Sequence, residues 1–126
     1  MKVKHVKVTE VGPRDGFQSE KTILKTEDKV NIINNLIKAG FPRIEVSSFV
    51  SPKAIPQLAD AELILNNVNR SPDTILAALV PNARGALRAV ESKIDENSNS
   101  NEELYSQILE LRNRIEKIES YLNFKQ

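Results

Sequence analysis

Three times before residue 92, a short apolar run ends at a turn and is followed by apolar residues at helical spacing. The runs lie at 6–11, 44–46 and 74–80, and the last is almost wholly apolar without alternation, which is typical of a strand buried on both faces. Strands that alternate with helices pair in parallel, because a helix supplies the crossover that parallel neighbours need. The sequence therefore predicts an α/β fold of about three strand–helix units with parallel strands.

Residues typical of helix ends bound the predicted helices. Thr26 is placed to cap the first helix and Gly40 to end it. In the second unit, Gln57 and Asp60 are placed to cap the helix. The three helices are expected over 26–40, over 58–68 and from residue 85 onwards.

The composition is that of a globular chain and excludes several kinds of function. Hydrophobic residues make up 40% and charged residues 28%, and no apolar stretch approaches the roughly 20 residues that cross a bilayer, so we expect no membrane partner. The net charge of +1 argues against a nucleic-acid partner. With no cysteine, the chain has no disulfide, thiolate metal site or sulfur nucleophile, and we expect a cytoplasmic location.

The charge balance changes along the chain. Residues 1–90 carry 13 basic and 9 acidic side chains, whereas residues 91–126 carry 5 and 8. The polar, low-complexity segment ENSNSNEE lies at the change and is typical of a linker. We therefore expect a domain over 1–92, a polar linker over 93–103 and a helix over 104–124.

The predicted C-terminal helix has an apolar seam. Its apolar residues recur in alternating steps of four and three, which is the pattern of a coiled coil. The pattern predicts a homo-oligomer formed through Leu104–Leu122; a helix that folds back on the first domain is the alternative. The seam consists of Leu104, Ile108, Leu111, Ile115, Ile118 and Leu122.

Polar motifs follow the first two predicted strands. VGPRDGFQ, residues 11–18, follows the first, and SSFVSPKAIPQLAD, residues 47–60, follows the second. Adjacent Arg14 and Asp15 after a Gly-Pro bend suit a site that holds a divalent cation beside a polarised carbonyl. The alternative is structural: the two side chains pair with each other or cap a turn.

Together these motifs carry a family resemblance. Residues 3 to about 90 resemble the N-terminal third of 3-hydroxy-3-methylglutaryl-CoA (HMG-CoA) lyase, whereas the Arg-Asp-Gly turn alone is common to a wider superfamily of metal-dependent carbon–carbon lyases and synthases. The resemblance implies a partial (β/α)8 TIM barrel, because a whole barrel takes about 250 residues. It also implies retro-aldol cleavage of HMG-CoA to acetyl-CoA and acetoacetate, with an acyl-CoA thioester as substrate and magnesium or manganese as cofactor.

The resemblance assigns roles to individual residues. It implies that Asp15 is a metal ligand, that Arg14 is catalytic and stabilises the enolate oxygen, and that Glu45 is a catalytic carboxylate near the cation. Structural alternatives are that Glu45 pairs with Arg14 or Lys53 and that Ser48 is an ordinary loop residue. The implied substrate contacts are Gln18, Ser48 and, after the third strand, Asn82.

This chain departs from the family pattern in ways that bear on activity. The family's complete site also uses a His-x-His pair, an asparagine from a later strand and a cysteine, none of which has a counterpart here. We therefore expect the chain to be inactive alone. The alternative function is a self-association module, driven by the heptad helix, with the barrel fragment as scaffold.

Overall fold

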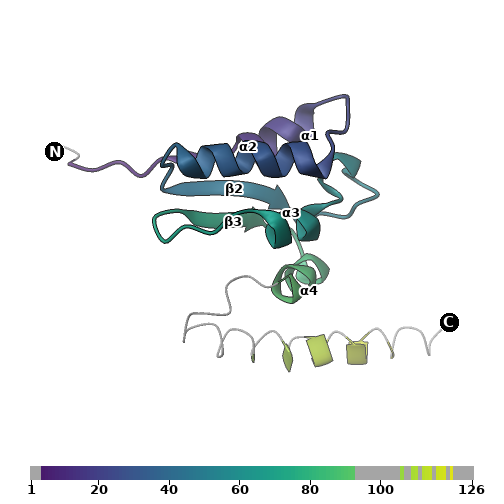
Figure 1. Cartoon of the computed structure of the whole chain (residues 1–126). Helices are drawn as coiled ribbons and strands as arrows, with labels where there is room; N and C mark the ends of the chain where they lie inside the picture. Colours follow the sequence, from purple (N-terminus) through teal and green to yellow (C-terminus); the bar gives the residue numbers. More distant parts are fainter. Residues whose placement is uncertain are drawn as a thin grey trace.

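A parallel three-stranded sheet forms the centre of the protein (Figure 1). The computed structural model describes residues 4–92 and, further along, 106, 109–110, 112–114, 116–118 and 120. The strands follow the order β1–β2–β3 and both pairs are parallel, which confirms the predicted α/β fold. The strands are β1 (Thr9–Glu10), β2 (Arg43–Ser48) and β3 (Ile75–Leu79).

Helices connect the strands and follow the last of them. Figure 1 shows α2 lying along β2, and α4 comes after β3. Short helical turns occupy the segment after β1 and the segment before α3. The helices are α1 (Phe17–Ser19), α2 (Thr26–Lys38), α3 (Ala61–Asn67) and α4 (Ala83–Glu91), and the turns are η1 (Gly12–Gly16) and η2 (Pro56–Leu58).

Helix α2 ends as predicted but begins differently. Gly40 follows its last turn with φ of 86°, a conformation that favours glycine over any residue with a side chain. The predicted cap Thr26 is instead the first helical residue, and Lys25 holds the cap position without a side-chain bond. The hydroxyl of Thr26 donates to Oδ2 of Asp60 at 2.7 Å, so a contact between segments replaces the local cap.

The hydrophobic core lies between the sheet and the helices α2 and α3. Ile44 and Val46 of β2 and Ile33 of α2 are completely buried, as is Ile64 of α3. Burial of each such side chain contributes about 1.5–3 kcal/mol relative to exposure. This core fixes which face of β2 is turned towards the helices.

A bulge in β2 reverses part of its alternation. Glu45 pairs with Ala77, and after the irregularity Ser48 pairs with Leu79. Because Ala77 and Leu79 are two residues apart on one strand, they share a face of the sheet, and so do their partners. Glu45 and Ser48 therefore lie on the same face. Ser47 and Ser48, which we expected in a loop, belong to the strand and are buried.

The first strand is shorter than predicted. Only Thr9 and Glu10 pair with β2, opposite Arg43 and Ile44. Val6 and Val8 precede the strand and are 79% and 54% exposed. The valine spacing alone did not reveal that the pairing with β2 is limited to two residues.

The C-terminal region is described at isolated positions. Those between 106 and 120 are helical, and Ile118 is 59% exposed. Arg112 bonds to Glu116 at 3.0 Å and to Glu91 of α4 at 3.3 Å. The linker 93–103 and the other seam positions, Leu104, Ile108, Leu111, Ile115 and Leu122, lie outside the described residues, so the coiled coil stays a prediction. In the described part of the chain, no helix has the length and apolar character needed to span a membrane.

Candidate functional site

The Arg-Asp pair lies in a single π-helical turn directly after β1. The backbone N–H groups of Arg14 and Asp15 both donate to the carbonyl oxygen of Val11, at 3.1 and 2.7 Å. The N–H of Gly12 donates to Oε1 of Glu10 at 2.7 Å, and Pro13 is buried beneath the turn. These bonds hold the two side chains at the carboxyl end of the strand, the end at which barrel active sites lie.

An ion pair joins this turn to the neighbouring strand. Nε of Arg14 donates to Oε1 of Glu45 at 2.5 Å, and both side chains are largely buried, at 22% and 20% exposure. Nη1 of Arg14 also donates to Oδ1 of Asp15 at 3.3 Å. The structure therefore brings Arg14, Asp15 and Glu45 together across 31 residues of sequence, and Glu45 pairs with Arg14, one of its two predicted structural partners.

In this arrangement Arg14 keeps hydrogen-bond donors, and Asp15 a carboxylate, that could bind further groups. A guanidinium has five N–H donors in a fixed fork, and the bonds of Arg14 use Nε and Nη1. The remaining donors suit an anionic oxygen that develops beside the turn. The carboxylate of Asp15 is 65% exposed, so it is accessible to a cation.

A metal ion would find only part of its ligand set here. Magnesium and manganese prefer several oxygen ligands in octahedral geometry. Asp15 fits as one such ligand, whereas the carboxylate of Glu45 is engaged by Arg14. Across residues 4–92 and the described C-terminal positions, no three His, Cys, Asp or Glu side chains are grouped to hold a metal.

The three predicted substrate contacts have different surroundings. Gln18 lies half-buried in α1, directly after the turn that carries Arg14. Ser48 shares a face with Glu45 but is only 2% exposed, and its hydroxyl has no hydrogen-bond partner among the described residues. Asn82 caps α4, since its Oδ1 accepts the N–H of Gly85 at 2.9 Å. Their contacts with substrate stay predictions.

Our sequence reasoning missed a buried lysine next to this region. Lys29 of α2 is 1% exposed, and its Nζ donates to Oδ1 of Asp60 at 2.8 Å and to the carbonyl oxygen of Gln57 at 2.7 Å. Asp60 and Gln57 were expected to cap α3; Asp60 does hold the N-cap position, but its side chain makes no cap bond and binds Lys29 and Thr26 instead. A signal was present, because Lys29 lies four residues before Ile33 and therefore on the buried stripe of α2.

A second cation, on α4, binds both α3 and the loop after β2. Arg88 donates to both carboxylate oxygens of Glu62, at 2.5 and 3.0 Å, and to the carbonyl oxygen of Val50 at 3.2 Å. Its guanidinium also lies 5.6 Å from the centre of the Phe49 ring. Partial burial raises the pKa of Glu62, but the hydrogen bonds and charge of Arg88 lower it more, so the carboxyl ionises below its usual range.

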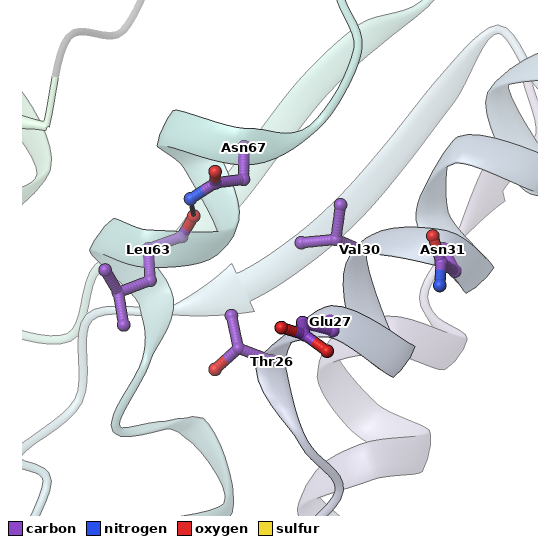
Figure 2. A pocket seen from close by; sticks show the side chains of 6 residues that line it. All are labelled: Thr26, Glu27, Val30, Asn31, Leu63 and Asn67. Carbon is purple, nitrogen blue, oxygen red and sulfur yellow. Dashed lines mark hydrogen bonds between the residues drawn. The ribbon is translucent and has the colours of Figure 1, made fainter.

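A pocket of about 360 Å³ opens elsewhere, between α2 and α3 (Figure 2). None of the predicted site residues lines it. Inside it, Nδ2 of Asn67 bonds to the carbonyl oxygen of Leu63 at 2.7 Å, so this amide is satisfied within its own helix. The pocket is thus separate from the candidate site. Its lining residues are Thr26, Glu27, Val30, Asn31, Leu63 and Asn67.

The chain is similar in sequence to part of known hydroxymethylglutaryl-CoA lyases. Hydroxymethylglutaryl-CoA lyase YngG of Bacillus subtilis is 47% identical over 93 residues, which are 74% of this chain and 31% of that protein. A mitochondrial hydroxymethylglutaryl-CoA lyase of Arabidopsis thaliana is 48% identical over 89 residues, 71% of this chain and 19% of that protein. The chain thus spans less than a third of the length of these relatives.

Solved structures agree with the sequence comparison. An HMG-CoA lyase from Acinetobacter baumannii, in complex with coenzyme A and 3-methylmalate, matches with a TM-score of 0.66 and 52% identity, over 68% of this chain and 28% of that one. The parallel three-stranded portion therefore matches part of an HMG-CoA lyase TIM barrel. Residues 5–100 match the family model described as HMGL-like. The chain belongs to the HMGL-like family, within the TIM-barrel lyase superfamily.

Proposed function

We propose that this chain carries one corner of an HMG-CoA lyase active site, at which HMG-CoA is cleaved to acetyl-CoA and acetoacetate. The observation that carries the proposal is the Arg14–Glu45 pair beside the exposed Asp15 at the carboxyl end of the sheet. Family membership supports the reaction class. The coenzyme A bound to the A. baumannii relative supports an acyl-CoA thioester as the substrate.

The reaction creates charge at a place that suits Arg14. A base removes the proton from the tertiary hydroxyl, the carbon–carbon bond breaks, and its electrons pass to the thioester as an enolate, which is then protonated at carbon. The permanently charged guanidinium of Arg14 stabilises the enolate oxygen. A bound magnesium or manganese ion would polarise the substrate oxygens, and Asp15 would be one of its ligands.

The other proposed residues support this corner. Glu45 holds the guanidinium of Arg14 in place through the 2.5 Å bond and keeps negative charge near the cation. Gln18 lies in the short helix α1 directly after the turn, and Ser48 lies on the same face of the sheet as Glu45. We propose both as substrate contacts, together with Asn82 at the start of α4.

We further propose that the 126-residue chain by itself does not turn over HMG-CoA. One exposed carboxylate holds magnesium or manganese weakly against water, because such sites need several directed ligands. A coupled acetoacetate assay with either metal, and a calorimetric manganese titration, test this statement. Turnover that disappears in Asp15→Ala would refute it.

A chimera tests the proposed function directly. Residues 4–92 would replace the matching segment of the B. subtilis lyase, to which the chain is 47% identical. We expect the chimera to cleave HMG-CoA, and Arg14→Gln to lower its kcat by about 10²–10³, the typical cost of one donor to a developing oxyanion. Surface variant Lys38→Gln, at the far end of α2, is the matched control. A folded chimera that binds manganese without turnover would contradict the proposal.

Self-association is the second candidate function. Ile75 and Leu79 share the sheet face of Glu45 and are 60% and 45% exposed, and Ile118 is also exposed. Uncovered apolar surface and strand edges favour association. Light scattering on the chain with and without residues 97–126 tests whether these residues drive self-association. An unchanged oligomeric state would exclude that role.

The cytoplasmic location also stays a prediction, since one relative is named mitochondrial.

A further inference from the structure

Lys29 is buried although its charge is costly to bury. The side chain is 1% exposed, and Nζ bonds to Asp60 and to the carbonyl oxygen of Gln57. Removing an ammonium group from water costs several kcal/mol, and apolar residues of similar volume often stabilise a core as well as a buried ion pair does. Core stability alone therefore does not account for a lysine at this position. The segments that Lys29 joins suggest its role.

These bonds join three segments that are distant in sequence. Lys29 and Thr26, in the first turn of α2, bind the two carboxylate oxygens of Asp60. From the same stretch as Asp60, Nε2 of Gln57 donates to the carbonyl oxygen of Glu20 at 3.1 Å. Lys29, Gln57 and Asp60 together form one set of contacts. It connects α2 to the end of the loop after β2, and through Gln57 to the end of α1.

The third segment leads directly to the candidate site. Glu20 ends α1, which has three residues, and the turn η1 with Arg14 precedes α1 without a gap. So short a helix does not hold itself in water, because helix nucleation is unfavourable. Besides the packing of buried Pro13, two side-chain hydrogen bonds among the described residues tie this segment to distant parts of the chain: Arg14 to Glu45 at one end and Gln57 to Glu20 at the other.

We propose that Lys29 and Gln57 are positioning residues, which hold segment 12–20 so that the guanidinium of Arg14 stays on Glu45. Lys29 fixes residues 57–60 against α2, and Gln57 transmits that position to Glu20. The proposal rests on the proposed function only in naming Arg14 and Glu45 as site residues. The restraint itself is a property of this chain's own contacts.

Arg88 provides a matched control. Like Lys29, it is a cation on a helix that bonds one carboxylate and one backbone oxygen: the carboxylate of Glu62 in α3 and the carbonyl of Val50 in the loop after β2. Its bonds reach Glu62 and Val50, and none of them reaches segment 12–20. Loss of Arg88 should therefore weaken the neighbouring contact between α4, α3 and the start of this loop, without removing a bond that leads to the segment carrying Arg14.

The test measures hydrogen exchange at Nε–H of Arg14 in the 126-residue chain by ¹H–¹⁵N spectroscopy, with Arg14→Lys to assign the signal. Lys29→Met and Gln57→Leu are compared with Arg88→Met under conditions in which each is folded. We expect exchange to be about tenfold faster in Lys29→Met and Gln57→Leu, the effect of losing about one ordinary hydrogen bond of restraint. In Arg88→Met the change should be less than about twofold.

Two results would overturn the proposal. One is unchanged exchange at Arg14 in folded Lys29→Met or Gln57→Leu; the other is equal acceleration in all three variants, which would show general loosening. If Lys29→Met does not fold, Gln57→Leu against Arg88→Met still decides, because Gln57→Leu keeps the carbonyl that Lys29 binds. The readout needs no metal, thioester or turnover, so failure of the proposed function would be seen separately, in the chimera.

Discussion

Gly85→Ala should destabilise the protein, although alanine is the better helix former. Gly85 is buried in α4, where that helix approaches the end of β2. A Cβ at this position would lie 2.5 Å from the backbone oxygen of Phe49 and 3.3 Å from its Cβ. A backbone oxygen cannot turn aside as the end of a flexible side chain can, so α4 has to move away from the sheet.

Two opposing effects determine how much Gly85→Ala changes the free energy of unfolding. In a helix interior, alanine is favoured over glycine by about 0.8–1 kcal/mol, and this is an upper limit for Gly85, the third residue of α4. Overpacking a close contact typically costs about 1–3 kcal/mol, and the larger part of that range applies because the clash is with backbone. The expected net loss is about 1–2 kcal/mol, which lowers the Tm of a domain of this size by roughly 4–16 °C.

Gly16→Ala is the matched control for this prediction. Gly16 has φ of −65° and ψ of −50°, and its added Cβ would meet no atom within 4 Å. Alanine there should stabilise the protein by about 0.4–1 kcal/mol, by restricting the unfolded chain. Thermal unfolding followed by circular dichroism compares both variants with the wild type. A Tm of Gly85→Ala at or above that of the wild type would refute the close approach of α4 to Phe49.

Substitutions at three further positions probe other contacts by unfolding. Arg88 keeps the pKa of Glu62 below its ordinary 4.5, so the pair stabilises the fold above about pH 4.5, and this stabilisation is lost as the pH falls below that value. Arg88→Met should remove this part of the pH dependence of the unfolding free energy, measured by urea titration. An unchanged pH profile in Arg88→Met would contradict this prediction. Asn82→Ala should cost about 1 kcal/mol through the lost cap of α4, whereas Asn82→Asp should retain most of it. Gly40→Ala, at φ of 86°, should cost about 1–2 kcal/mol, and an unchanged Tm would show that α2 ends differently.

The helix α2 and the strand β3 could be predicted because their signals are local. Apolar residues at helical spacing, an acidic first turn and Gly40 all lie within the helix or next to it. The apolar run 74–80 predicted a strand, and β3 occupies Ile75–Leu79. Burial on both faces was wrong for this strand, since Ile75 and Leu79 are 60% and 45% exposed. Prediction was poorer where the length of a strand depends on the strand it pairs with. β1 was expected over 6–11 but pairs with β2 at only two residues, because its length depends on contacts with β2.

The contacts of Arg14 illustrate a different limit. From sequence, pairing with Asp15 or Glu45 was the structural alternative to a catalytic role. Both pairs form, at 3.3 and 2.5 Å, yet the guanidinium retains donors for an oxyanion. The two readings are thus compatible, because an ion pair that fixes a guanidinium also prepares it to meet developing charge. No pattern within 11–18 predicts which acid 31 residues away completes the pair.

The bulge in β2 explains why Ser48 could not be placed by alternation. Strand side chains alternate between faces, so Glu45 and Ser48, three residues apart, should lie on opposite faces of the sheet. The sequence predicted Ser48 in a loop, and the family resemblance assigned Glu45 and Ser48 to one site; regular alternation in a strand that reaches Ser48 conflicts with a shared site. The pairing of Glu45 with Ala77 and of Ser48 with Leu79 resolves the conflict, since one extra residue of β2 returns Ser48 to the face of Glu45. No residue type marks that insertion within IEVSS; the pairing with β3, some thirty residues away, decides it. The face of a site residue on this sheet therefore follows from the register between strands.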